Sequence, residues 1–365
     1  MEESQGRFRP VVSVVIVNFN CGQLLSAAVR AVLASPVSLE IIVADNGSSD
    51  DSLASLRNRF GTHPRVRIIE NGQNLGFARA NNRILLQARG EYILLLNPDC
   101  VVYADTITSM LAAMEAQPKA GLGGCLIRNP DGTEQAGARR AVPTPWRTFV
   151  RVLQLNRLFP HHPRFRSFVL SQEPLPGEPT FVEAISGAFM LVRREALEQV
   201  GPLDEGYFLH CDDLDWCMRF RQAGWQNLFV PGAEAIHYQG TCSRTRLIRV
   251  LWHKHRGMVR FYRKFFRHQY PGPLMWAVVS SVWARFGILT AGCLFRMMWQ
   301  GSATFAVPTA EELECAMAAR RPVSDAHVDA PQLLGVVRQR GRAATFAKLP
   351  RDRQRRPSHR PTARN

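Results

Sequence analysis

The chain has 365 residues, which fits one large domain with appendages or two domains. Its hydrophobic content of 46% is enough for a substantial core, and its net charge of +16 favours anionic lipid, nucleic acid or phosphate-bearing substrates as partners. Positions 1–10 are polar and lack an apolar core, so we expect no signal peptide and a reducing, cytoplasmic location. The eight cysteines form no Cys-x-x-Cys pair, which excludes a zinc knuckle and predicts buried, reduced thiols.

Apolar runs alternate with helical patterns over the first hundred residues. Strands are predicted at 11–17, 39–44, 66–69 and 92–96, and helices at 23–34, 51–60 and 76–88. This alternation predicts parallel βαβ units in a sheet that is covered on both faces. Ligands bind beyond the carboxyl ends of such strands. The polar residues that follow these strands, and that we expect to share one crevice, are Asn18, Asn20, Asp45 and Asp99.

The middle of the chain is less regular. Positions 129–179 are rich in Pro, Arg and aromatic residues with little periodicity, which predicts a long loop over the site. Regular structure is expected again as a strand at 188–192, a helix at 213–223 and a strand at 226–230.

Two helices are predicted after residue 245. Positions 248–266 are basic and amphipathic, and positions 274–299 are largely apolar but interrupted by Arg285 and Arg296. The longest unbroken apolar run is shorter than the roughly 20 residues of a spanning helix. This pattern favours helices that lie in the interface of an anionic membrane, and the alternative is that both simply pack on the domain. The chain is thus divided into a domain at 1–245, membrane-associating helices at 246–305 and a basic tail at 306–365 whose composition predicts disorder.

Two single carboxylates are candidates for ligand binding. Asp45 follows a strand and can accept hydrogen bonds from a base or a ribose, although Asx turns with glycine close loops in the same way. Asp99 follows a strand whose pairing Pro98 blocks. A carboxylate there suits Mg²⁺ or Mn²⁺, which neutralises a diphosphate leaving group. Capping of the next helix is the alternative, but Asp105 is better placed for that role.

A crowded acidic cluster and one histidine complete the candidates. Asp212, Asp213 and Asp215 place three carboxylates within four residues, which raises at least one pKa and suits a general base. The alternative is that one or two of them only stabilise the N-terminus of a helix. His237 follows an apolar run and is a candidate metal ligand, although a lone histidine is usually structural.

Ordered motifs run through about residues 10–245. They are VVIVNFN at 14–20, VADNGSSD at 43–50, NLGFARANN at 74–82, GEYILLLNPD at 90–99, SGA at 186–188, GPLDE at 201–205, DLDWCMR at 213–219 and GW at 224–225, followed by His237 and Ser243. In this order they resemble the family 2 glycosyltransferases of the GT-A fold. The similarity is greatest to a rhamnosyltransferase-like branch, in which Asn-Pro-Asp at 97–99 replaces the usual Asp-x-Asp.

The resemblance implies a fold and a set of roles. The fold is α/β, a Rossmann-like and mostly parallel sheet flanked by helices, with 1–245 as the catalytic domain and amphipathic helices after it. The donor nucleotide would contact Val17, Asn18, Asn20, Asp45, Arg79 and Asn97, and a divalent metal would be held by Asp99 and His237. Asp213 would be the catalytic base, beside Asp212 and Asp215, and the acceptor would lie at Ser186 and Gly187. Family members commonly carry Glu-Asp where this chain has Asp212-Asp213, so the first carboxylate of the pair stands on a shorter side chain here.

The expected function is an inverting, metal-dependent transfer of a sugar, with rhamnose as the candidate, from a nucleotide-diphosphate donor to a hydroxyl of a saccharide acceptor. The acceptor is expected on a polyprenyl diphosphate at the inner face of the cell membrane, in cell-surface polysaccharide synthesis. No nucleic-acid partner is expected, because no helix-turn-helix or aromatic RNA-binding signature is present.

Two other functions stay open. A nucleotidyltransferase that makes sugar nucleotides needs a Gly-rich phosphate loop, whereas positions 18–22 hold one glycine. A non-catalytic protein that binds membranes or polyanions would explain the charge. It would leave Asp45, Asp99, Asp213 and His237 without a shared purpose.

Overall fold

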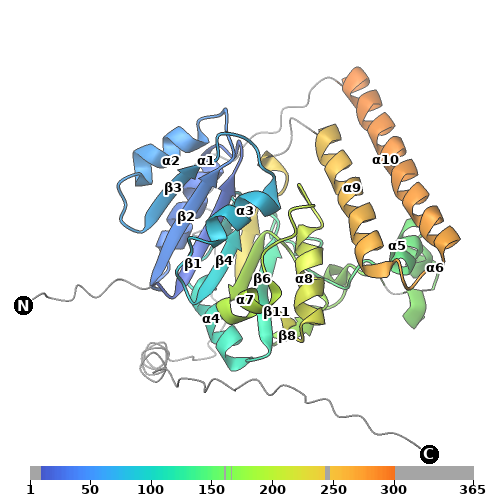
Figure 1. Ribbon diagram of the computed structural model, residues 1–365, viewed down its shortest axis with the longest axis horizontal. Coiled ribbons are helices and arrows are strands. Elements are labelled where there is room, and N and C mark those ends of the chain that lie inside the picture. The colour runs from blue at the N-terminus through green and yellow to red at the C-terminus, as the bar shows by residue number, and fades with distance from the viewer. Residues whose placement is uncertain (1–9, 160–161, 166, 243–246, 301–365) are drawn as a thin grey trace, which may run out of the picture. The chain divides into compact units, whose positions relative to one another are not determined.

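The computed structural model of the chain describes residues 10–159, 162–165, 167–242 and 247–300 (Figure 1). Ser243 and the predicted tail at 306–365 lie outside these residues. All elements named below belong to one compact unit of the chain.

A nine-stranded mixed sheet forms the centre of this unit, in the order β3-β2-β1-β4-β10-β6-β11-β5, with β8 also paired to β11. Strands β3, β2, β1 and β4 are parallel, and β10 runs antiparallel between β4 and β6. A separate two-stranded ribbon joins β7 to β9. The strands are β1 (Val12–Asn18), β2 (Leu39–Asp45), β3 (Val66–Glu70), β4 (Tyr92–Leu96), β5 (Cys100–Val102), β6 (Ala120–Arg128), β7 (Arg139–Arg140), β8 (Thr180–Val182), β9 (Ala184–Ile185), β10 (Phe189–Arg193) and β11 (Gln226–His237).

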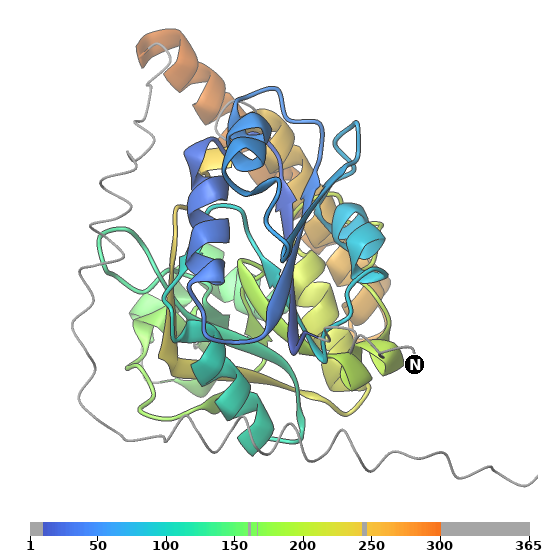
Figure 2. The same cartoon turned by 90° about the vertical axis from the view of Figure 1, so that its left-hand side faces the viewer.

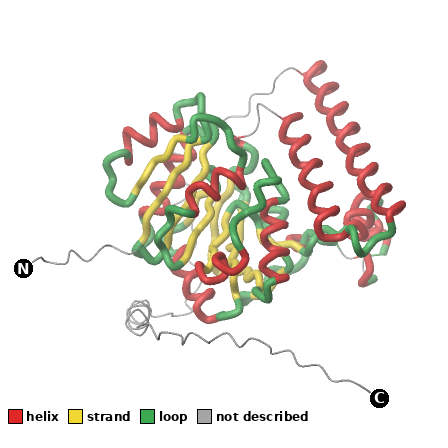
Figure 3. Tube along the Cα trace, viewed as in Figure 1, coloured by secondary structure: helices red, strands yellow, loops and turns green. Residues whose placement is uncertain are grey.

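Helices cover both faces of the sheet, as the tube in Figure 3 shows. They are α1 (Gln23–Leu33), α2 (Ser52–Phe60), α3 (Phe77–Leu85), α4 (Thr106–Ala116), α5 (Pro145–Val152), α6 (Leu155–Leu158), α7 (Arg194–Val200), α8 (Asp212–Gln222), α9 (Leu247–Phe266) and α10 (Gly272–Gln300). The predicted α/β fold with C-terminal helices is confirmed.

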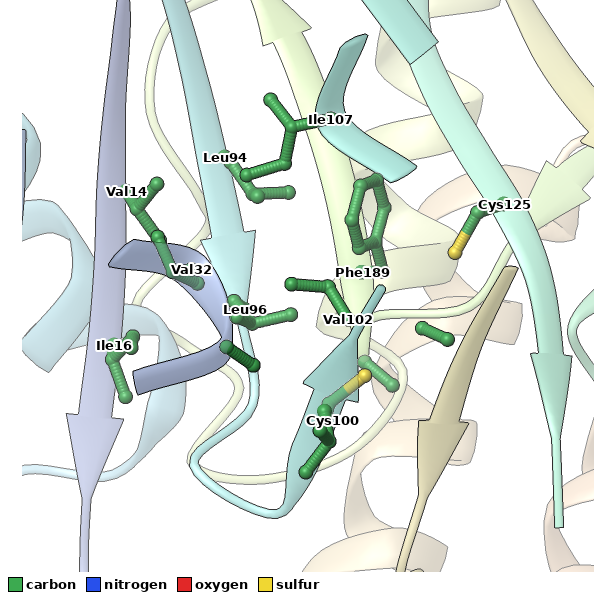
Figure 4. Close-up of a cluster of buried hydrophobic side chains, with 14 of the residues drawn as sticks. Val14, Ile16, Val32, Leu94, Leu96, Cys100, Val102, Ile107, Cys125 and Phe189 are labelled. Atoms are coloured by element: carbon green, nitrogen blue, oxygen red, sulfur yellow. The ribbon is translucent and has the colours of Figure 1, made fainter. Parts of the chain in front are cut away.

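Alternation along the strands separates two cores. In β1, Val14 and Ile16 pack in the cluster that includes α1 and α4, whereas Val15 packs in the cluster that includes α3, α7 and α8. Figure 2 shows α1 and α3 on opposite sides of the strands. Figure 4 shows Ile107 of α4 and Val32 of α1 over the side chains of β1 and β4. Because both of their faces are buried, β1, β2 and β4 are mainly apolar in the sequence, whereas β3 at the edge of the sheet is half polar.

The segment at 129–179 is not the long irregular loop that we expected. It holds β7, α5, α6 and two short 3₁₀ turns, and Val150 is fully buried. A hydrogen bond of 2.8 Å between Thr148 Oγ1 and Tyr262 Oη connects α5 to α9. The segment is therefore part of the folded unit.

The two C-terminal helices differ in their surroundings. The C-terminal half of the apolar face of α9 is buried, with Val259, Tyr262 and Phe266 packed in the same core as residues of α10, whereas Trp252 is 43% exposed. In contrast, the apolar 25-residue stretch Gly272–Arg296 of α10 is long enough to cross a membrane by length and composition, and only 11% of its most apolar window is buried. The exposed apolar surface of this region thus belongs mainly to α10.

Candidate active site

The residues at the ends of β1 and β2 form one hydrogen-bond network. Asn18 donates through Nδ2 to Asp45 Oδ1 at 2.8 Å, and Asp45 Oδ2 accepts the backbone N–H groups of Gly47 and Ser48 at 3.0 and 2.9 Å. Asn20 Oδ1 accepts the Ser49 N–H at 2.7 Å. The structure therefore brings three of the predicted donor-binding residues together, and Val17 lies next to them on β1, paired with Ala44.

In this conformation the Asp45 carboxylate is occupied by hydrogen bonds from neighbouring residues of the protein. It is 2% exposed, and among the residues that the structure describes its oxygens accept hydrogen bonds from residues 18, 47 and 48. The buried Asn18 Oδ1 has no hydrogen-bond partner within the described residues, so this amide oxygen is free to accept from a ligand. Arg79 lies apart at the start of α3, with its side chain 64% exposed and a 4.0 Å ion pair to Glu205.

The candidate metal ligands meet at the ends of β4 and β11. His237 Nε2 lies 3.1 Å from Asp99 Oδ1 and 3.3 Å from Asn97 Nδ2. On its other side, His237 Nδ1 lies 2.7 Å from Gln135 Oε1. The Gln135 amide donates through Nε2 to Asn129 Oδ1 and to the backbone carbonyl of His237, so its Oε1 has to act as an acceptor.

This network fixes the histidine tautomer. Nδ1 carries the proton that Gln135 accepts, which leaves Nε2 with a lone pair directed at the Asp99 carboxylate. Two acceptors at 3.1 Å repel each other unless a cation, either a metal ion or a proton, bonds to both. Because carboxylate oxygen and imidazole nitrogen are ligands of divalent metals, the residues present fit such an ion, with Gln135 in the supporting role.

The candidate base lies at the start of α8. Asp213 Oδ2 accepts the Gly187 N–H at 3.2 Å and also bonds to the Arg140 guanidinium. The neighbouring Ala188 carbonyl accepts the Asn97 N–H at 3.0 Å. One short segment, which also contains Ser186, therefore contacts both the Asp213 carboxylate and the residue next to the metal pair.

The residues before α8 have unusual backbone geometry. His210 and Cys211 both adopt φ of 66°, a left-handed conformation that is costly outside glycine. Asp212 follows them and is 5% exposed, with its Oδ2 unpaired within the described residues. Burial and the charge of Asp213 raise the pKa of Asp212 to about 7. Strain and a shifted acid at one place are typical of functional sites.

Asp215 lies elsewhere. It is fully buried, and its carboxylate bonds to Arg219 at 2.8 Å and to Lys264 of α9 at 2.6 Å. Lys264 also bonds to Asp204 at 2.8 Å. These contacts favour a structural role in docking α9 on α8, rather than the catalytic role that the acidic cluster suggested for Asp215.

One expectation about the cysteines is wrong. Cys21 and Cys242 form a disulfide, whereas Cys100, Cys125, Cys211 and Cys217 are free and buried as predicted. The crosslink joins the loop after β1 to the residues after β11, and its sulfurs lie close to an Asp99 oxygen. Adjacency of positions 21 and 242 depends on the fold, so the spacing in the sequence could not show it.

Gln135 and Arg140 are further residues that the sequence analysis missed. Both lie in the segment 129–179, whose composition predicts a loop, and each reaches a partner more than 70 positions away. The only local signal was charge, because Arg139 and Arg140 are adjacent.

Comparisons with known proteins place most of the chain in an enzyme family. The model of the family "Glycosyl transferase family 2" matches residues 13–201. The N-acetylglucosaminyl-diphospho-decaprenol L-rhamnosyltransferase of Mycobacterium tuberculosis is 30% identical over 298 residues, 78% of this chain and 95% of that protein. The rhamnosyltransferase WbbL of Escherichia coli is 26% identical, over 67% of this chain and 89% of that protein.

Solved structures agree on the fold. A mannosyltransferase from Pyrobaculum calidifontis, solved with GDP-Man and Mn²⁺, superposes with a TM-score of 0.50 at 19% identity. The superposition covers 92% of this chain and 81% of that protein. The expectation of a rhamnosyltransferase-like member is confirmed by these comparisons, and the chain belongs to glycosyltransferase family 2.

Proposed function

We propose that this glycosyltransferase transfers a sugar, with rhamnose as the first candidate, from a nucleoside diphosphate to a saccharide on a polyprenyl diphosphate, with inversion at the anomeric carbon. The observation that carries the proposal is the connection between Asp99–His237 and Asp213 through the Asn97–Ala188 hydrogen bond. The choice of rhamnose rests on both bacterial relatives named above, and the lipid-linked acceptor rests on the mycobacterial one.

One group of residues binds the donor, and another activates the acceptor. Asn18, Asn20 and the backbone near Val17 bind the nucleoside, and Asp99, His237 and Asn97 face its diphosphate. A bound Mg²⁺ or Mn²⁺ would neutralise the charge that develops on the leaving diphosphate. Asp213, held by the Gly187 N–H, takes the proton from the acceptor hydroxyl. Attack from the face opposite the diphosphate inverts the anomeric centre in one displacement.

Donor binding is tested by thermal unfolding with UDP, dTDP or GDP, each with and without Mn²⁺ or Mg²⁺. A ligand at about 100 times its Kd stabilises the native state by about 2.7 kcal/mol. We expect a metal-dependent rise in melting temperature with one nucleotide in the wild type and none in Asp99→Asn. Absence of a rise with all three nucleotides would contradict the proposed donor site.

We also assign membrane contact to α10, at the inner face of the cell membrane. Its exposed side chains include Trp276, Phe295 and Trp299, which are 69%, 62% and 79% exposed. Large aromatic residues in such positions favour the membrane interface. Vesicles with anionic lipid are expected to sediment the wild type, and the double variant Trp276→Ser, Trp299→Ser is expected to stay in the supernatant. Equal sedimentation of both proteins would refute this assignment.

A further inference from the structure

Positive side chains gather beside the Asp213 carboxylate. Arg140 of β7 bonds to Asp213, and its buried Nε has no hydrogen-bond partner within the described residues. Lys254 of α9 lies close enough to Arg140 and Asp213 for their charges to act on its ammonium group. Arg285 of α10 is a further cation near Lys254 and bonds to His255 at 3.1 Å. Three elements that are distant in the sequence thus contribute positive charge to one place.

The position of Lys254 follows from the way α9 meets the start of α8. A Cβ atom on Gly257 would lie 2.9 Å from the His210 carbonyl oxygen and 3.4 Å from Cys211 Cβ, so α9 approaches this backbone very closely. Lys254 precedes Gly257 by three residues and shares its helix face. The ammonium group is therefore presented to the strained segment that positions Asp213.

Lys254 has no acidic partner of its own within the described part of the chain. Asp213 already bonds to Arg140, and Lys254 makes no hydrogen bond or ion pair with a carboxylate among these residues. Desolvation of the ammonium group by the surrounding protein and the charge of Arg285 lower the pKa of Lys254. The lysine side chain is nevertheless accessible to solvent. An unpaired cation held among like charges is stabilised by an anion that arrives from outside.

The location restricts which anion fits. Helix α9 packs between α8, which carries Asp213, and α10, which carries the exposed apolar surface (Figure 1). An anion at Lys254 is therefore near the base on one side and near the apolar helix on the other. A sugar on a polyprenyl diphosphate has its reacting hydroxyl on one side of the diphosphate and its lipid on the other. Arginine and lysine are the usual partners of such phosphate groups.

We infer that Lys254, together with Arg140, binds the diphosphate group of the acceptor and so places the acceptor hydroxyl at Asp213. This inference rests on the proposed function, because it assumes a lipid-linked acceptor. The diphosphate of the donor has the same chemistry, and the experiment separates the two sources.

The test measures binding by calorimetry with farnesyl diphosphate as the probe, while a saturating nucleoside diphosphate and Mn²⁺ fill the donor site. Farnesol is the uncharged control ligand. Lys254→Gln is expected to weaken farnesyl diphosphate binding by about 10- to 100-fold, as for loss of one charged hydrogen bond. Nucleotide affinity and the weak binding of farnesol should stay unchanged. Lys254→Arg keeps the charge and should retain binding within a few-fold.

Lys119→Gln is the matched control, because Lys119 is an exposed lysine next to α4, outside the site. It should bind farnesyl diphosphate as the wild type does. Equal binding by Lys254→Gln and the wild type would overturn the inference, and so would weaker nucleotide binding with unchanged farnesyl diphosphate binding, which assigns Lys254 to the donor. Failure of the wild type to bind any nucleotide would instead overturn the proposed function.

Discussion

His237 Nε2 lies 3.1 Å from Asp99 Oδ1, while its Nδ1 is held 2.7 Å from Gln135 Oε1. The glutamine thereby directs the imidazole lone pair at the carboxylate, and the two groups together match the ligand chemistry of a divalent metal. The role of Gln135 can be tested directly, since it can be substituted while both candidate ligands, Asp99 and His237, are kept.

Gln135→Leu should weaken metal binding without abolishing the site. Loss of the amide frees the imidazole to rotate and to change tautomer, and loss of such a partner typically costs about 10- to 100-fold in metal affinity. The measurement is the Mn²⁺ concentration needed for half of the nucleotide-dependent rise in melting temperature. Asn129→Ala is the control, because Asn129 contacts Gln135 but not the histidine ring. The same midpoint for Gln135→Leu and the wild type would argue against a supporting role.

Only part of the sheet could be predicted from the sequence. Strands β1, β2 and β4 were predicted to within one residue because a fully buried strand is a local apolar run. β6 was missed, because it carries glycines where the helices approach most closely. A Cβ on Gly121 would lie 2.7 Å from Phe220, and one on Gly123 would lie 2.8 Å from Met114. A strand thinned in this way loses the β-branched pattern on which its prediction depends.

The site was predictable where it follows strand ends and not where it depends on distant pairs. Asp99 follows β4 and Asp213 lies in the first turn of α8, and both elements have local sequence patterns, whereas Arg140 meets Asp213 across 73 positions and Gln135 meets His237 across 102. The apolar stripe of α9 is a further example. The same pattern serves a membrane surface or a protein core, and only the contacts of Tyr262 and Phe266 show that it faces protein.

Kinetic measurements should distinguish the roles of Asp213 and Asp215. Asp213→Asn removes the proposed base, and a loss of about 10²- to 10⁴-fold in kcat is expected, with nucleotide binding retained. Asp215→Asn instead leaves Arg219 and Lys264 without their buried partner, which should lower the free energy of unfolding by about 3–5 kcal/mol. The activity of its folded fraction should stay near that of the wild type. A large loss of kcat in folded Asp215→Asn would show that Asp215 takes part in catalysis and would contradict its structural role.

Asp212 should make stability depend on pH. Its pKa is raised to about 7 in the native state, by burial and by the charge of Asp213, against a reference value of 3.8. Between these values the native state binds more protons than the unfolded state, so the free energy of unfolding falls as the pH rises through about 7. Asp212→Asn cannot ionise and lacks this contribution. Its melting temperature relative to the wild type should therefore increase from about pH 5 to about pH 8, and a constant difference would contradict the raised pKa.

Gly257 should tolerate no side chain, even though alanine favours a helix by roughly 1 kcal/mol over glycine. The added Cβ would lie 2.9 Å from the backbone oxygen of His210, which cannot rotate away. Either α9 or the left-handed segment before α8 has to shift, and a displacement there moves Asp213. We expect Gly257→Ala to lose activity and to lower the melting temperature.

Gly287→Ala on α10 is the matched control for this substitution, since among the described residues no atom beyond the adjoining backbone of its own helix lies within 4 Å of the added Cβ. It should keep its activity and melt at the same temperature or slightly higher. If Gly257→Ala behaved like Gly287→Ala in both measurements, close packing of α9 against the start of α8 would not be what holds Asp213 in place. The geometry that presents Lys254 to the site would then lose its support as well, because the same contact fixes both residues.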